Sequence, residues 1–198
     1  MRDGVILGKM ATRMGRGTSL SLEERYGCLT QHRRDHSERV ALAMETLGRA
    51  HGLDMAACRL AGWGHDLARE MSRPQLLAEA ARLELTWGQD EEREPILLHG
   101  PIAAQWMRLA GQGNESVWRA IRFHTTAGPH LDDVAKALFV ADGVEPGRHY
   151  PERAALWELA LVDLEAGYRA VLQHTLAYLQ ERGLAPHPHM LEALKTED

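Results

Sequence analysis

Apolar residues recur every three or four positions along most of the chain from residue 19 onward, which is the spacing that lines one face of an α-helix. Two clear stripes are Val40-Met44-Leu47 and Val117-Ala120-Ile121. No segment alternates apolar and polar residues with the period of two that indicates a strand. The sequence therefore predicts an all-α fold, a single helical bundle of about eight or nine helices.

Capping and breaking residues set the expected boundaries of these helices. Asp35 and Asp54 are expected N-caps, Pro74 suits a first helical turn, and Gly52 suits a C-terminus. The polar, acidic segment 84–94 is expected to be a loop. The expected helices span about 20–33, 36–51, 55–70, 73 onward, 101–109, 115–124, 131–141 and 151–183, with a break near residue 163 and a short final helix.

A length of 198 residues, with 44% apolar and 26% charged residues, is typical of one globular domain. We expect residues 1–18 to be a flexible leader, residues 19–184 to form the domain, and residues 185–198 to be a tail with a short helix. No apolar stretch has the length of a bilayer span, and the basic N-terminus lacks the apolar core of a signal peptide. Two cysteines are too few for a disulfide framework, so these features together indicate a cytoplasmic protein.

The charge and the histidine content narrow the class of function. A net charge of −5 argues against a broad basic surface for nucleic acid, and no feature indicates a membrane partner. The chain has 11 histidines, which outnumber its tyrosines and phenylalanines combined. Histidine is the commonest metal ligand and a frequent proton shuttle, so the positions of these residues decide what they indicate.

Three polar residues lie at the ends of apolar stripes on three different helices. His36 precedes Val40 by four positions, His124 follows Ile121 by three, and Asp142 follows Leu138 by four. A single inward histidine is usually a hydrogen-bonded core residue. A carboxylate on an apolar face needs a cation, which a nearby lysine or arginine or a metal ion would supply.

Further residues extend this set along the chain. The pair His65-Asp66 follows the small-residue run 61–64, and His99 precedes a helix. Four imidazoles and two carboxylates on separate segments suit a dinuclear site for borderline or hard transition metals, in which Asp66 is able to bridge two ions. The absence of cysteine from the set disfavours structural zinc.

The order and context of these residues resemble the HD-domain phosphohydrolases and, more narrowly, their YqeK group of symmetrical diadenosine tetraphosphate hydrolases. The resemblance covers about residues 20–184. A His-Asp pair alone is weakly informative, whereas the five segments in order are specific. They read RRDHSERV (33–40), AGWGHDLA (61–68), LLHGP (97–101), AIRFHTT (120–126) and ADGVEPGR (141–148).

The resemblance implies the roles of individual residues. One metal ion would be held by His36, His65, Asp66 and Asp142, and a second by Asp66, His99 and His124. Iron is the metal that the family usually carries, with manganese, magnesium and cobalt as alternatives. His65, Asp66 and Arg69 would be catalytic, and Arg69 replaces a lysine that is common in the family. Arg148, Glu145, Thr125 and Arg69 would contact the nucleotide.

The activity that the resemblance implies is metal-dependent hydrolysis of diadenosine tetraphosphate to two ADP. The alternatives are another HD phosphohydrolase, such as a nucleotidase or a second-messenger hydrolase, and a non-catalytic nucleotide-binding module. A ferritin-like di-iron bundle is disfavoured because no glutamate has a histidine three residues later. The expected partner is a small dinucleoside polyphosphate or nucleotide, and a homodimer is left open.

Overall fold

The computed structural model describes residues 20–195, and these residues contain helices and turns but no strand. The all-α fold is therefore confirmed, whereas the expected count of eight or nine is too low, since this range holds eleven α-helices and one 3₁₀ helix. The helices are α1 (Leu22–Cys28), α2 (Gln31–His51), α3 (Met55–Gly64), α4 (Arg73–Arg82), α5 (Gln89–Arg93), α6 (His99–Leu109), α7 (Glu115–Phe123), α8 (Asp133–Val144), α9 (Arg153–Val162), α10 (Leu164–Glu181) and α11 (Pro188–Lys195), with the 3₁₀ helix η1 (Pro95–Leu98) before α6.

Two features account for the additional helices. Segment 84–94, expected as a loop, contains α5, because the Gly88 amide donates a hydrogen bond of 2.8 Å to the Glu91 carboxylate and closes the first turn. Acidic residues in that turn also face the positive end of the helix dipole. The break expected near residue 163 is present and divides the stretch 151–183 into α9 and α10, because the Asp163 side chain accepts a 3.0 Å hydrogen bond from the Ala166 amide and caps α10.

Some helix boundaries near the histidine-bearing segments differ from the expected ones. Thr30, rather than Asp35, caps α2, since the Thr30 hydroxyl accepts a hydrogen bond from the Arg33 amide at 3.3 Å. The third helix ends at Gly64 instead of near residue 70, and residues 65–70 continue as turns. The expected leader, residues 1–18, lies outside the described residues, and the expected final helix corresponds to α11.

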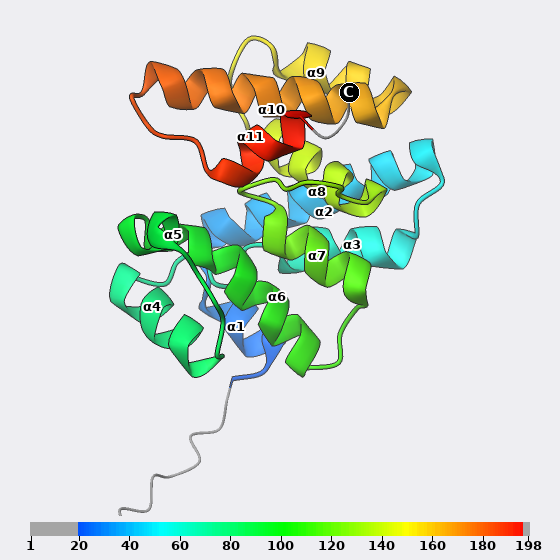
Figure 1. Ribbon diagram of the computed structural model, residues 1–198. Coiled ribbons are helices and arrows are strands. Elements are labelled where there is room, and N and C mark those ends of the chain that lie inside the picture. The colour runs from blue at the N-terminus through cyan, green and yellow to red at the C-terminus, as the bar shows by residue number, and fades with distance from the viewer. Residues whose placement is uncertain (1–19, 196–198) are drawn as a thin grey trace, which may run out of the picture.

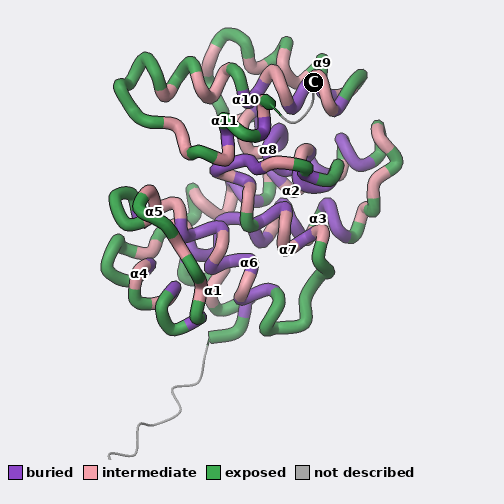
Figure 2. The backbone as a smooth tube through the Cα atoms, in the orientation of Figure 1, coloured by how far each residue is buried: buried purple, intermediate pink, exposed green. Residues whose placement is uncertain are grey.

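The helix α8 is the central element of the fold. Figure 1 shows α2 and α8 crossing the middle of the molecule, with α9 and α10 on one side and α3, α6 and α7 on the other. α8 contacts α2, α3, α7, α9 and α10, and most of its residues are buried. Figure 2 shows the same concentration of buried backbone in the central helices. A helix packed on all sides gives a fixed position to the residues of its last turn.

Close packing of α2 against α3 depends on a glycine. A Cβ atom on Gly62 would lie 2.6 Å from the Ala41 Cα, which is closer than real Cβ contacts allow. The small-residue run before His65-Asp66 therefore has a structural reason, because it lets two helices that carry site residues approach each other.

Two further features concern the bilayer and the cysteines. Among the described helices, none has the length and apolar character that crossing a bilayer requires. Both cysteines are free thiols; Cys58 is buried and Cys28 is exposed.

Candidate metal centre

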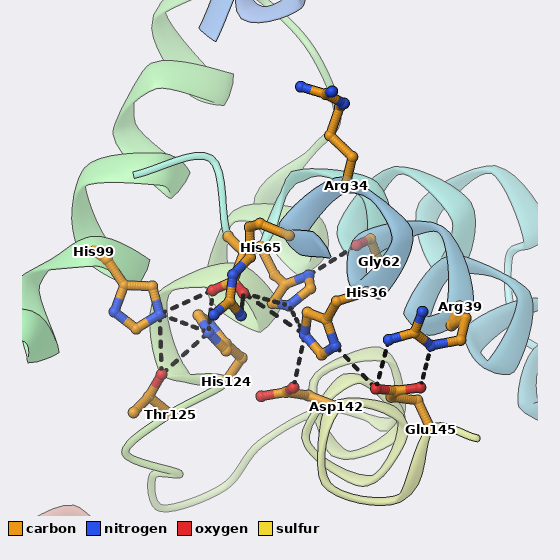
Figure 3. Close-up of polar contacts among 12 residues, drawn as sticks. Arg34, His36, Arg39, Gly62, His65, His99, His124, Thr125, Asp142 and Glu145 are labelled. Atoms are coloured by element: carbon orange, nitrogen blue, oxygen red, sulfur yellow. Dashed lines mark hydrogen bonds and ion pairs between the residues drawn. The ribbon is translucent and has the colours of Figure 1, made fainter. Parts of the chain in front are cut away.

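The structure brings the six predicted metal ligands together in one cluster (Figure 3). Five of them are buried, with exposed fractions of 0–4%, and Asp142 is partly exposed. They come from α2 (His36), the turn after α3 (His65 and Asp66), the start of α6 (His99), the residue after α7 (His124) and the last turn of α8 (Asp142).

The Asp66 carboxylate lies between two groups of histidines. Its Oδ2 atom is 3.6 Å from His36 Nε2 and 3.5 Å from His65 Nε2. Its Oδ1 atom is 3.2 Å from His99 Nε2 and 3.8 Å from His124 Nε2. Asp66 thus offers one oxygen to each group, as a bridging ligand does.

We name the two groups by their residues. The first half consists of His36, His65, Asp142 and the Oδ2 atom of Asp66, and His36 Nε2 lies 3.2 Å from Asp142 Oδ1. The second half consists of His99, His124 and the Oδ1 atom of Asp66.

Three of the histidine rings are oriented by backbone carbonyl groups three residues earlier in the chain. The Nδ1 atom of His65 lies 2.8 Å from the Gly62 carbonyl oxygen, and that of His124 lies 2.7 Å from the carbonyl oxygen of residue 121. His99 Nδ1 makes the same contact with the carbonyl of residue 96. With Nδ1 donating to a carbonyl, the Nε2 lone pair of each ring is free to bind a cation.

His36 is oriented differently, by the carboxylate of Glu145. His36 Nδ1 lies 3.1 Å from Glu145 Oε1, and the other Glu145 oxygen accepts a 2.6 Å hydrogen bond from Arg39 Nε. Glu145 is 2% exposed and also accepts a hydrogen bond from the Gly147 amide. Although burial opposes its charge, these partners lower the pKa of Glu145 to about 2, so the residue is an ionised support behind His36.

The contacts between the rings indicate that the cluster suits cations. His99 Nε2 and His124 Nε2 are 3.0 Å apart, and His36 Nε2 and His65 Nε2 are 3.3 Å apart. Two facing lone pairs at such distances repel unless a proton or a metal ion lies between them. The nitrogen and oxygen donors of the cluster therefore fit a metal ion.

The two halves differ in how strongly they hold protons. Burial disfavours a charged His36, yet hydrogen bonds to Asp142 and Glu145 raise the pKa of His36 to about 9. Burial and the neighbouring His99 lower the pKa of His124 to about 3. His36 is thus protonated and His124 neutral near pH 7 when no metal is bound.

The carboxylates of the cluster stay ionised. Burial alone raises the pKa of Asp66, but the adjacent His65 holds it well below its usual value. Burial acts in the same way on Asp142, where the hydrogen bond from His36 and the charge of Arg148 prevail and lower the pKa of Asp142. Ionised carboxylates and neutral imidazoles are the forms that bind metals.

A second glycine sets the distance between the helices of the second half. A Cβ atom on Gly100 would lie 2.8 Å from the Ile121 carbonyl oxygen and 3.2 Å from His124 Nδ1. Only glycine lets α6 pack this closely on the end of α7, so that His99 and His124 meet. The His-Gly element of the sequence is therefore a packing requirement as well as a ligand.

A cavity of about 820 Å³ opens beside the cluster. Its walls include His124, Thr125, Asp142 and Arg148 together with residues of α10. Arg148 Nη2 lies 2.6 Å from Asp142 Oδ1, and the Thr125 hydroxyl lies 3.1 Å from His124 Nε2. Two of the predicted substrate contacts, Thr125 and Arg148, thus line a space large enough for a nucleotide.

Comparison with known proteins identifies the family of the chain. The family model of the HD domain matches residues 33–147, which is more than half of the chain and contains the whole cluster. The chain belongs to the HD domain family. The pair His65-Asp66 is its eponymous motif, and the resemblance read from the sequence is confirmed.

Three relatives show how far this similarity extends. A protein of Halalkalibacterium halodurans named symmetrical bis(5'-nucleosyl)-tetraphosphatase is 30% identical over 90% of this chain and 94% of its own length. A Bacillus subtilis protein of the same name is 28% identical over 85% of this chain and 93% of its own. The crystal structure of a predicted HD superfamily hydrolase involved in NAD metabolism from Clostridium acetobutylicum matches with a TM-score of 0.82 and 26% identity, covering 88% of this chain and 95% of that one.

Two predicted substrate contacts of this HD domain lie away from the cavity walls. Glu145 is buried behind His36, as described above. Arg69 is half-buried in the turn after the HD pair, and its amide donates a 2.9 Å hydrogen bond to the Asp66 carbonyl. The Arg69 side chain makes no hydrogen bond or ion pair with another residue in 20–195 and does not line the cavity.

Arg33, which is not among the site residues predicted from the sequence, also contacts the cluster. Arg33 Nη1 lies 2.6 Å from Asp66 Oδ2. The spacing contained the signal, because Arg33 precedes His36 by three positions and therefore shares its face of α2.

Proposed function

We propose that the chain is a metal-dependent phosphohydrolase that cleaves diadenosine tetraphosphate symmetrically into two molecules of ADP. The observation that carries this proposal is the buried cluster of four imidazoles and two carboxylates beside a cavity of about 820 Å³. The two curated relatives that the chain matches over at least 93% of their length carry the corresponding name.

For the cofactor, we propose two iron ions, with manganese, magnesium and cobalt as the alternatives. The six ligands offer nitrogen and oxygen donors, which suit borderline and hard cations. Bound in the two halves, such ions lower the pKa of a coordinated water and neutralise charge on phosphoryl oxygens during in-line displacement.

The residues of the chain then have separate tasks. His65 and Asp66 are proposed to hold the reacting centre, with Asp66 fixing the spacing between the two halves. Arg148 is proposed to bind the polyphosphate chain, because it lines the cavity beside the first half. Thr125, next to the second half, is proposed to donate a hydrogen bond to a phosphoryl oxygen, and Arg69 is proposed as an additional phosphate contact.

Glu145 is proposed to act through His36. The sequence predicted that Glu145 contacts the nucleotide, but its two oxygens are bound by His36, Arg39 and the Gly147 amide. A carboxylate behind a histidine fixes the ring and raises its basicity as a ligand. We therefore assign Glu145 a positioning role.

The bond change in the proposed reaction is simple. One water adds to a phosphorus atom at the centre of the tetraphosphate bridge, and the central P–O bond breaks. Each half of the substrate leaves as ADP, so that the product is a single species.

Product identification tests the proposal. Protein loaded anaerobically with Fe²⁺ is incubated with diadenosine tetraphosphate, and the nucleotides are separated by anion-exchange chromatography. We expect ADP as the sole product, with parallel samples loaded with Mn²⁺, Co²⁺ or Mg²⁺ ranking the metals. Formation of ATP plus AMP, or an intact substrate, would overturn the symmetrical hydrolysis.

The same assay separates the alternative activities. A panel of nucleoside monophosphates, ATP and a cyclic dinucleotide distinguishes a nucleotidase or second-messenger hydrolase from the proposed enzyme. A metal-loaded protein that binds nucleotide without turnover would instead be a binding module. The homodimer stays a prediction, which light scattering after size-exclusion chromatography tests.

A further inference from the structure

The bridging carboxylate of the metal centre already has a cationic partner within the protein. Asp66 Oδ2 lies 2.6 Å from Arg33 Nη1, which is closer than either histidine nitrogen of the first half. Asp66 is 3% exposed and the Arg33 side chain is 22% exposed. This contact is therefore a mostly buried, charge-assisted hydrogen bond.

The Arg33 guanidinium is held incompletely in this position. Its Nε atom is buried and has no hydrogen-bond partner among the described residues. A buried donor without a partner is unfavourable, so the position is stabilised mainly by the charge of Asp66. The neighbouring Arg34 differs, because its guanidinium points away from the cluster and binds Gly27, Leu29 and Gln31 (Figure 3).

Arg33 and a metal ion in the first half would compete for the same oxygen. Both are cations, and at a separation of a few ångström in a buried site they repel strongly. The contact of Arg33 is with Oδ2, which faces His36 and His65, and not with Oδ1, which faces the second half. The competition is therefore confined to one of the two metal positions.

We propose that Arg33 is a resident counter-ion, which neutralises Asp66 in the metal-free protein and leaves Asp66 Oδ2 when the first half binds its metal ion. Arg33 thereby lowers the metal affinity of the first half relative to the second. It also offsets the free-energy cost of a buried, negatively charged carboxylate while no metal ion is bound. The inference rests on the metal centre of the proposed function, but not on the substrate.

The first test measures Mn²⁺ binding to the metal-free full-length protein by electron paramagnetic resonance of the free ion. Arg33→Gln is expected to raise the affinity of one of the two ions on the order of tenfold and to leave the other unchanged. Arg33→Lys, which keeps the charge but not the planar fork, is expected to give a smaller increase. Arg34→Gln removes the same charge one residue away and is expected to change neither affinity.

The second test separates a counter-ion from a merely structural residue. Arg33→Gln is expected to lower the melting temperature of the metal-free protein and to leave that of the Mn²⁺-loaded protein unchanged. A structural role would lower both equally. If Arg33→Gln yields no folded metal-free protein, the Arg33→Lys protein gives the same two measurements.

Two results would overturn the proposal: an unchanged or weaker Mn²⁺ affinity in the Arg33 variants, or an equal loss of melting temperature in both forms. Neither result depends on turnover. A chain that shows the expected Arg33 effect but leaves diadenosine tetraphosphate intact would overturn the proposed function alone.

Discussion

The two halves of the metal centre share Asp66 but differ in the groups that contact and orient their histidines. In the first half, His36 is backed by the carboxylate of Glu145 and faces that of Asp142. In the second half, both histidines are backed by backbone carbonyls, and a second carboxylate, Asp142, comes within metal-ligand distance of His124 only as part of a group with His65. The first half thus has more carboxylate groups around its histidine, whereas the histidines of the second half are held mainly by neutral backbone groups.

The surrounding cations follow the same division. Arg33, Arg39 and Arg148 contact Asp66 Oδ2, Glu145 and Asp142, all on the side of the first half. In the metal-free first half, the proton of His36 and the contacts of Arg33 and Arg148 therefore occupy ligand atoms that a metal ion would bind. Among the described residues, no arginine contacts the ligand atoms of the second half. Two sites of similar ligand type are expected to differ in affinity and in pH dependence for this reason.

The largest effect is expected from removing the residue that both halves share. Asp66→Asn deletes the negative charge between them, so metal content should fall in both and hydrolysis should fall at least about 1,000-fold, or about 4 kcal/mol of transition-state stabilisation. Metal analysis and product chromatography measure the two losses. Asp133→Asn, on the exposed first turn of α8, is the matched control and should change neither. Two retained ions in Asp66→Asn would contradict a bridging role.

The next effect separates the halves from each other. Asp142→Asn is expected to remove the ion of the first half and His99→Gln that of the second, each leaving about one ion per chain and lowering hydrolysis about 100-fold. Elemental analysis counts the ions that remain. If either variant lost both ions, the two halves would be a single cooperative site and the comparison would be broken.

The pH dependence of metal binding sharpens the comparison further. A metal ion in the first half must displace the proton of His36, whose pKa is about 9, so its affinity should rise about tenfold per pH unit up to about pH 9. His124, with a pKa of about 3, loses no proton in this range. Titrations of His99→Gln and Asp142→Asn with Mn²⁺ between pH 6 and 8 compare the two halves, and equal slopes would contradict the difference.

Glu145→Gln tests why the metal affinity of the first half is expected to rise with pH. The amide still accepts a hydrogen bond from His36 Nδ1 but carries no charge, so the pKa of His36 should fall toward its ordinary value. The pH dependence of the first half should then weaken, and its affinity near pH 9 should fall about 10- to 100-fold. A loss of nucleotide affinity with metal binding unchanged would instead favour the substrate contact that the sequence predicted.

The smallest expected effect lies on the substrate side of the second half. Thr125→Val removes a hydroxyl of nearly the same volume as a methyl group, and the loss of one hydrogen bond should raise KM or lower kcat about 3- to 10-fold. Steady-state kinetics with diadenosine tetraphosphate measure the change, and Thr175→Val, on the α10 wall of the same cavity, is the control. No change in Thr125→Val would remove this residue from the proposed substrate contacts.

How much of this site was predictable depends on the kind of interaction. The inward direction of His36, His124 and Asp142 was predictable from helical periodicity, whereas their assignment to shared metal positions rested on the resemblance to HD phosphohydrolases. The pairing of Glu145 with His36 spans 109 positions of the sequence and depends on the packing of α2 against α8, which periodicity does not specify.

The helices of the fold were likewise predictable only in part from the sequence. Long amphipathic helices such as α2 and α10 were predictable, whereas α5 depends on one local hydrogen bond between Gly88 and Glu91. The start of α2 at Gln31, directly after its N-cap Thr30, was missed because Thr30 and Asp35 are both competent N-caps, and the choice between them is made by tertiary contacts. One such contact is the Glu70 carboxylate, which binds the Thr30 amide and hydroxyl.

The glycines at positions 62 and 100 have a consequence for how this protein tolerates mutation. Neither carries a functional group, yet a single added methyl at either would meet a backbone atom at less than 3 Å. In a saturation scan scored by metal content, both positions should be as intolerant as the ligands themselves. The positions at which substitutions reduce metal content would therefore include, besides the ligands, glycines that bind no metal but lie where two helices are in close contact.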